Sequence, residues 1–300
     1  MGVIGGETGE AASFSLLSML VGIVPKNLVN PIVNGEMLQV IFVAVIFGIC
    51  INKLGDKVKI LHDFIDAMNN FCLRMITMIV TFIPFIAFLS MASLVINVGL
   101  DSVLILGKLV MGQLGGSLIM VGVYLLILLV IGRITPIPFL KKIPSFVPIP
   151  LSTCSSNATM PFTLKFCSEK MGISQKLSSF SIPVGATVNM DGGCFYLSIA
   201  SIMLARMYGV ELDFDVLFTV FVTVVALSIG APGVPGGAFV CLASIVAALG
   251  LPVEATAIVL GIDPICSMLR TALNATGDIA ATTALAKNED LIDEDIYRKV

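Results

Sequence analysis

The chain has 300 residues, of which 57% are hydrophobic and 12% are charged, and its mean hydropathy is +1.03. About 25% of the residues of a soluble domain are charged. The composition therefore excludes an ordinary soluble domain and predicts an integral membrane protein, whose first partner is the lipid bilayer. The net charge of −3 argues against a nucleic-acid partner, which would call for a basic surface.

Five apolar runs are long enough to cross a bilayer, which takes about 20 helical residues. In chain order they cover residues 36–54, 63–98, 102–134, 176–207 and 251–287. The sequence therefore predicts an all-α polytopic membrane protein with long, tilted transmembrane helices.

Two further apolar segments are interrupted. Residues 137–170 contain the polar block LSTCSSNATMP, and residues 214–250 contain the Gly/Pro block SIGAPGVPGG. Non-helical backbone survives at membrane depth only where it is buried in protein or lines a wet cavity. We therefore interpret both segments as re-entrant helical hairpins. Two such hairpins beside long helices indicate an inverted-repeat transporter, whose broken elements carry the substrate and ion sites.

Basic residues divide unequally between the two sides of this topology. Most lie on one side, and the other side receives Lys26, Lys108 and Arg206 beside an acidic loop. Cytoplasmic loops carry the excess of Lys and Arg. We therefore predict a multi-pass protein of the plasma (inner) membrane with a cytoplasmic tail at residues 288–300.

A polar stripe interrupts the last apolar segment. Its members are Asp263, Ser267, Arg270, Asn274 and Asp278, and their offsets of 4, 7, 11 and 15 residues place them on one face of a helix. Ionisable residues are costly inside a membrane and indicate function by default. Arg270 can bind a carboxylate bidentately, although an internal pair with Asp263 is the alternative.

Another polar stretch, GATVNMDGG, covers residues 185–193. Its glycines favour local unwinding, which frees backbone carbonyls. Free carbonyls and the oxygens of Asn189 and Asp191 suit a hard cation, and Na+ is the natural candidate. A helix cap or a turn is the simpler alternative. Asn274 and Asp278 indicate a second cation site with Asn189.

The two hairpin tips differ in chemistry. The first, residues 152–161, is rich in hydroxyls, and a helix beginning near Ala158 would point its positive end at an anion. An ordinary polar loop is the alternative. The second tip, residues 228–237, offers little side-chain chemistry, and its glycines suit a moving gate or close approach to a ligand.

Taken together, these motifs resemble those of the dicarboxylate/amino acid:cation symporter family, the glutamate-transporter fold. The matching stretches, in the family's order, are TCSSNATMP, PVGATVNMDG, SIGAPGVPGG and GIDPICSMLRTALNATGD. The resemblance implies an elevator-type homotrimer. Residues 1–134 would form part of a scaffold and trimerisation region, and residues 135–290 would form a transport domain. That domain would contain the hairpins 137–170 and 214–250 and the helices 176–207 and 251–287.

The resemblance also implies where ligands bind. One Na+ site would use Gly185, Asn189, Asn274 and Asp278. A second would use backbone atoms of Thr187, Met190, Ser228, Ile229 and Ala231, and a third would use Asn189 and Asp191. Substrate would contact Ser155, Ser156, Val234, Gly236, Arg270, Thr271 and Asn274. No enzymatic cofactor is implied, and Na+ is the expected coupling ion, with H+ as the alternative.

Departures from the family pattern narrow the substrate. Amino-acid carriers of the family usually have Asp where Ser267 stands, and that Asp binds the substrate ammonium. A serine at this position resembles the C4-dicarboxylate branch, whose substrates have no ammonium group. Gly193 replaces the family's usual Thr. No counterpart of the family's first three helices precedes residue 24, so we expect either a fragment or a separate chain that supplies them.

The sequence thus predicts a symporter that couples Na+ or H+ influx to uptake of a C4-dicarboxylate or an acidic or neutral amino acid. The alternative is a truncated, non-transporting remnant or partner subunit. An enzyme is not expected. An intramembrane aspartyl dyad from Asp191, Asp263 and Asp278 would carry G-x-G-D, whereas residues 275–278 read ATGD.

Overall fold

The computed structural model describes residues 24–34, 37–80, 100–228 and 237–299, together with positions 85, 89 and 96. Within these ranges the regular elements are helices, without a strand, and one isolated antiparallel bridge joins Ile173 to Ile292. The all-α class predicted from the sequence is confirmed.

The described helices, in chain order, are α2 (Asn30–Asn34), α3 (Met37–Leu54), α4 (Lys59–Val80), α6 (Leu100–Leu126), α7 (Ile137–Phe146), α8 (Pro148–Thr153), α9 (Ser156–Glu169), α10 (Gln175–Val188), α11 (Asp191–Met207), α12 (Phe214–Ser228), α13 (Gly237–Ala248), α14 (Ala257–Leu260), α15 (Asp263–Asn288) and α16 (Glu294–Arg298). Shorter 3-10 turns cover η1 (Gly55–Val58) and η3 (Val253–Thr256), and a π-helical turn, η2 (Ile127–Ile131), extends α6.

Two spans of the described chain are long and apolar enough to cross a membrane, namely Leu106–Ile131 and Gln175–Met207. A third candidate is the pair Val253–Leu260 and Asp263–Asn288, which bends by 83° at the break. The sequence predicted one helix over residues 251–287, so the bend is a difference from expectation. Pro264 explains it, because a proline in the second position of α15 would break a helix that continued from α14.

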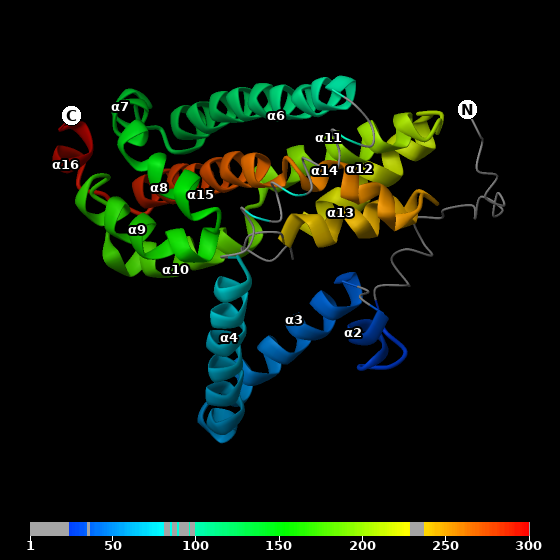
Figure 1. Ribbon diagram of the computed structural model, residues 1–300. Coiled ribbons are helices and arrows are strands. Elements are labelled where there is room, and N and C mark those ends of the chain that lie inside the picture. The colour runs from blue at the N-terminus through cyan, green and yellow to red at the C-terminus, as the bar shows by residue number, and fades with distance from the viewer. Residues whose placement is uncertain are drawn as a thin grey trace.

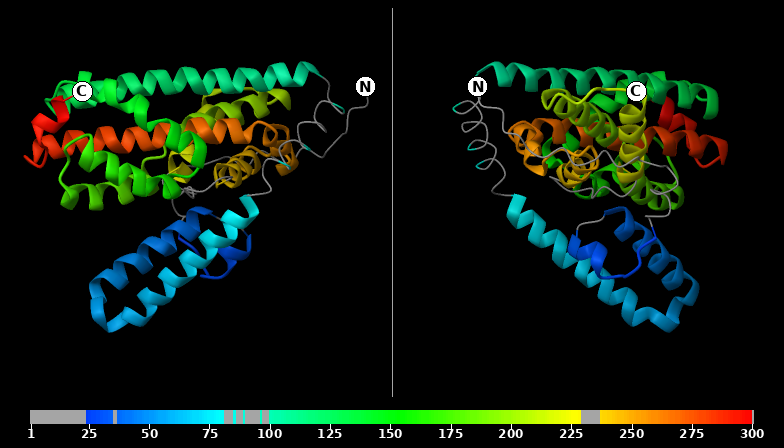
Figure 2. Two further views of the ribbon diagram at one scale, coloured as in Figure 1. Left: turned by 60° about the vertical axis from the view of Figure 1, so that its left-hand side comes forward. Right: turned by 90° about the vertical axis from the view of Figure 1, so that its right-hand side faces the viewer.

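The main body is a bundle organised around α15. The helix α6 runs alongside α15 and α11, while α8, α9 and α10 pack on α15 from other directions (Figure 1). The helices α3 and α4 form a hairpin that projects away from this body in every view (Figure 2). The bundle therefore places α15 in the interior, where its polar stripe is shielded.

Two apolar cores flank the middle of α15. One gathers side chains of α11, α12, α13 and the first turn of α15, up to Cys266. The other gathers side chains of α6, α7, α9 and the later part of α15, from Leu273 onward. Arg270 lies between these two positions along the helix, so the polar stripe crosses the junction of the two cores.

A buried lysine ties the outer ends of α7 and α9 to α16. The Lys142 ammonium donates hydrogen bonds to the carbonyls of Lys170 at 2.7 Å, Ile296 at 2.8 Å and Tyr297 at 2.7 Å. The Tyr297 hydroxyl in turn donates to the carbonyl of Thr135 at 2.8 Å. The beginning of α7 and the end of α9 therefore lie at the same end of the bundle.

Candidate functional site

The helix over residues 176–207 is interrupted in its middle, as the glycines of this stretch predicted. The break falls at Asn189 and Met190, whose φ, ψ angles of −87°, 82° and −109°, 46° are not helical. A helix start leaves backbone N–H groups without partners inside the helix. Here the side-chain oxygen of Asn274 accepts a hydrogen bond from the Gly192 N–H at 2.8 Å, so α15 supplies a partner for the start of α11.

Side chains from three helices converge at this break. The Asn189 amide donates to the Asp278 carboxylate at 3.0 Å and to the Asn274 carbonyl at 3.4 Å. The Tyr124 hydroxyl, from α6, donates to the Asp191 carboxylate at 2.6 Å. Asp278 and Asn274 are both buried. The two carboxylates and two amides that the sequence singled out as cation ligands therefore gather in one polar network around the break, Asp278 bonded to Asn189 and Asp191 bonded to Tyr124.

Close backbone approach at this network depends on glycine. A Cβ on Gly277 would lie 2.5 Å from the Tyr124 hydroxyl oxygen and 2.7 Å from the Asn189 amide nitrogen. A Cβ on Gly185 would collide with the Asp278 carboxylate. The absent side chains leave room for the network.

This requirement predicts unequal effects of two glycine-to-alanine changes. We expect Gly277→Ala to lower the free energy of unfolding by about 1–3 kcal/mol, because the added methyl group overpacks the network. Gly122→Ala, in α6, has nothing within 4 Å of the new Cβ and should be neutral or slightly stabilising. Thermal unfolding of the purified proteins in detergent measures both, and equal midpoints would contradict the proposed tight packing.

Arg270 is buried and paired in this structure. Its Nη1 donates to the Asp263 carboxylate at 2.9 Å, and its guanidinium carbon lies 4.2 Å from the centre of the Tyr196 ring. The internal pair that the sequence left as an alternative is therefore present. A guanidinium has five N–H donors, so a pair through one terminal nitrogen is compatible with additional binding of an anion.

The first hairpin tip packs near the same helix. The helix α9 begins at Ser156, two positions before the expected start at Ala158, and the Ser155 hydroxyl caps it by accepting a hydrogen bond from the Ala158 N–H at 3.2 Å. Cys154 takes a left-handed conformation with φ of 51°, which turns the chain between α8 and α9. Ser155 and Ser156 are both buried.

The remaining residues of the expected ligand sets fall into three groups. Ser267 and Thr271 are buried on the polar stripe of α15. Ser228 is buried at the end of α12, whereas the Thr187 side chain is exposed and bonds back to its own helix. Four residues of the second tip lie outside the described residues, namely Ile229, Ala231, Val234 and Gly236.

Three contributors were missed by sequence reasoning. Tyr124 bonds to Asp191, Tyr196 stacks on Arg270, and Gln113 donates to the carbonyl of Cys266 at 3.0 Å. Tyr124 and Gln113 are isolated polar side chains inside an otherwise apolar span. That isolation was the available signal, since a buried polar group needs a partner.

The ligand chemistry of the network suits a hard cation. Its candidate ligands are carboxylate, amide and backbone oxygens, which hard cations prefer. Among the described residues there is no group of three or more His, Cys, Asp and Glu side chains able to hold a metal. Oxygen ligands of this kind suit a hard cation, whereas a transition metal would favour imidazole or thiolate ligands.

Comparisons with known proteins all indicate the same family. The model of the sodium:dicarboxylate symporter family matches residues 2–288. The chain is 33% identical over 279 residues to the C4-dicarboxylate transport protein of Bacillus subtilis (strain 168), which covers 93% of the chain and 66% of that protein. It is 30% identical over 288 residues to the proton/sodium-glutamate symport protein of Bacillus caldotenax, covering 96% of the chain and 68% of that protein.

A human relative is also similar. The chain is 32% identical over 246 residues to human neutral amino acid transporter A, which covers 81% of the chain and 46% of that protein. The chain thus spans about half of the length of the human protein and about two thirds of the lengths of the two bacterial ones. All three are transport proteins, which agrees with the expectation that this chain is not an enzyme.

Proposed function

Because this chain belongs to the sodium:dicarboxylate symporter family, we propose that it carries the binding sites of a secondary active symporter. Entry of Na+ or H+ would drive uptake of a small anionic substrate. The observation that supports this most strongly is the buried junction between α15 and the broken helix α10–α11. Two carboxylates and two amides meet there, near a buried arginine on the same face of α15.

For the cations, we propose that one Na+ binds between the two halves of the broken helix and α15. The Asp278 carboxylate would supply the charge, and the carbonyls of Gly185 and Asn274 would supply neutral oxygens. The Asn189 amide, which donates to Asp278 at 3.0 Å, would turn its oxygen to the ion. A further ion would bind at Asp191 and Asn189, where the Tyr124 hydroxyl now occupies one carboxylate oxygen.

We propose a third cation site between the broken helix and the second hairpin tip. It would use backbone atoms of Thr187, Met190, Ser228, Ile229 and Ala231. Met190 and Ser228 are buried in the described part of the chain, which supports their access to an enclosed ion. H+ remains the alternative coupling ion, because one of the relatives is a proton/sodium symport protein.

For the substrate, we propose that Arg270 binds a carboxylate beside the tip serines Ser155 and Ser156. Ser267 and Thr271, buried on the same helix, would line the site, and Val234 and Gly236 would close it. Ser267 carries no charge to attract an ammonium group. We therefore favour a C4-dicarboxylate, with acidic or neutral amino acids as the competing substrates.

The proposed architecture has both hairpins re-entrant. The bonds of Lys142 and Tyr297 support this for residues 137–170, because they join Thr135, just before α7, and Lys170, at the end of α9, to α16. We propose that the part comprising residues 135–290 moves relative to a partial scaffold in residues 1–134, within a homotrimer. α6 lies in that scaffold range, but its side chains are hydrogen bonded to α11 and α15, so we propose that α6 moves with residues 135–290.

Reconstitution of the purified chain into liposomes tests the proposal. We expect uptake of labelled succinate that needs an inward Na+ gradient and that grows when the interior is negative. One net charge moved across 100 mV supplies about 2.3 kcal/mol, or roughly a 50-fold concentration ratio. Uptake of labelled aspartate, measured in parallel, decides between the two substrate classes.

The same preparation separates the alternatives. Binding of succinate or aspartate without uptake, together with uptake after co-expression of a second chain, would identify a partner subunit. Uptake that proceeds unchanged when K+ or choline replaces Na+ at constant pH, and that instead follows a pH gradient, would assign coupling to H+. Absence of both binding and uptake in every arm would contradict the proposed function.

A further inference from the structure

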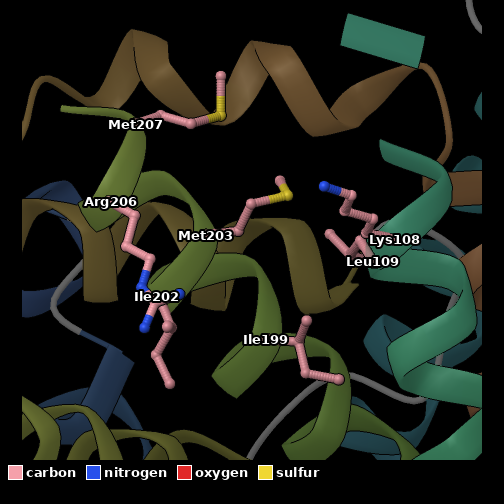
Figure 3. Close-up of a pocket in the computed structure, with 7 residues that line it drawn as sticks. All are labelled: Lys108, Leu109, Ile199, Ile202, Met203, Arg206 and Met207. Atoms are coloured by element: carbon pink, nitrogen blue, oxygen red, sulfur yellow. The ribbon is translucent and has the colours of Figure 1, made fainter. Parts of the chain in front are cut away.

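A separate cavity lies between α6 and the last turns of α11, away from the polar junction (Figure 3). Its volume is about 430 Å³. The lining residues are Lys108 and Leu109 of α6 and Ile199, Ile202, Met203, Arg206 and Met207 of α11. We call this cavity the α6–α11 cleft. Five of its seven lining side chains are apolar, and the other two are cationic.

The two cations lie at the same edge of the predicted membrane-spanning layer. Lys108 is in the first turn of the span Leu106–Ile131, and Arg206 is in the last turn of the span Gln175–Met207. Since both line one cleft, the start of one span and the end of the other are at similar depth. Long basic side chains at the ends of spans extend their charges toward the headgroup region while their stems stay in apolar surroundings.

Among the described residues, neither cation is paired with an acidic side chain. Both side chains are exposed, and among the ion pairs of the described residues none contains Lys108 or Arg206. The acidic residues that follow α11, Glu211 and Asp213, form no such pair with them. Figure 3 shows Lys108 reaching from α6 toward α11, while Arg206 extends along α11 beside Ile202. The cleft thus offers two available positive charges at the rim of an apolar surface.

We propose that the α6–α11 cleft binds one phospholipid that carries a net negative headgroup. The headgroup would contact Lys108 and Arg206, and part of one acyl chain would lie against Leu109, Ile199 and Met203. A soluble anion would gain nothing from the apolar lining, and a neutral lipid would gain nothing from the two charges. Methionine side chains are flexible and polarizable, so Met203 and Met207 suit a chain of variable shape.

The charge contribution sets the expected size of the selectivity. A basic residue near an anionic lipid surface contributes about 1 kcal/mol, which is about a fivefold change in affinity. Two such residues should therefore favour phosphatidylglycerol over phosphatidylcholine by about 25-fold. The preference should weaken as salt is raised, because these charges are exposed to screening.

Native mass spectrometry of the purified full chain, titrated with each lipid in detergent, measures this preference. We expect Lys108→Gln and Arg206→Gln each to lower the affinity for phosphatidylglycerol about fivefold and the double variant about 25-fold. The matched control is the double variant Arg133→Gln with Lys176→Gln. It removes two exposed cations at the opposite ends of the same two spans and should leave the affinity within twofold.

A cleft-filling variant distinguishes the cavity from a merely basic surface. We expect Ile199→Trp, which keeps both cations, to weaken phosphatidylglycerol binding while the unfolding temperature stays unchanged. Equal affinity for the two lipids, an equal loss in the control variant, or unaltered binding in Ile199→Trp would overturn the proposal. Displacement of the lipid by water-soluble glycerol phosphate at equal concentration would also overturn it, since the ligand would then be a soluble anion.

Discussion

Replacing Arg270 with alanine is expected to weaken the binding of a dicarboxylate strongly. Truncating one partner of a buried charged hydrogen bond costs about 2–5 kcal/mol, which corresponds to an affinity loss of roughly 30-fold to several thousand-fold. Arg270 is 5% exposed, so water cannot easily replace the lost donor. Isothermal titration with succinate and with aspartate, each in Na+, measures the loss.

The ion pair with Asp263 requires a control for folding. Removing Arg270 leaves Asp263 buried without its partner, and breaking a buried pair typically destabilises a protein by about 3–5 kcal/mol. We therefore expect the double variant Asp263→Asn with Arg270→Ala to recover much of the unfolding temperature but not the affinity. Retained succinate affinity in a folded double variant would refute the assignment of Arg270 as the anion-binding residue.

Replacing Asp278 with asparagine is expected to weaken Na+ binding strongly while preserving the fold. The asparagine is nearly isosteric and still offers an oxygen to the Asn189 amide, which now bonds to Asp278 Oδ1 at 3.0 Å. The negative charge is lost, however. Even residues that only orient metal ligands change affinity by about 10- to 100-fold, so we expect at least that loss from a direct ligand. The Na+ concentration dependence of succinate binding provides the measurement.

A matched acidic residue controls for the change in net charge. Asp215, at the start of α12, is exposed, so Asp215→Asn should leave the Na+ dependence unaltered. A bound cation stabilises the folded state in proportion to its affinity, and loss of Na+-dependent thermal stabilisation in Asp278→Asn alone would support the assignment. The same Na+ dependence in both variants would place the ion elsewhere.

Local features of the sequence anticipated a large part of this arrangement. The stripe from Asp263 to Asp278 lies on one helix, as its spacing predicted, and each of its five members is buried. The unwinding predicted between Gly185 and Gly193 is present, although the non-helical residues are Asn189 and Met190, because the flanking glycines lower the helix propensity of the stretch. Both results follow from spacing and backbone preference, which a single segment carries by itself.

Other features depend on contacts between distant segments, which no single segment encodes. The hydrogen bond from Tyr124 to Asp191 joins residues 67 positions apart. Nothing in the apolar run around Tyr124 indicates which residue it bonds to. The 83° bend before α15 is not evident from the hydropathy of the sequence, because the apolar run continues from α14 into α15. Pro264 could have indicated the break, but a proline in the first turn is also an ordinary helix start.

The hydrogen bonds at the polar junction have a mechanical consequence. Asn274 joins α15 to the start of α11, and Tyr124 joins α6 to α11, in each case through a short bond of 2.8 Å or less. A shift of any one helix by a single turn would break such a bond in a buried setting, where an unsatisfied polar group costs about 1–3 kcal/mol. The three helices should therefore travel together as one stiff body. A crosslink placed between α6 and α11 should therefore leave the proposed motion of this body intact.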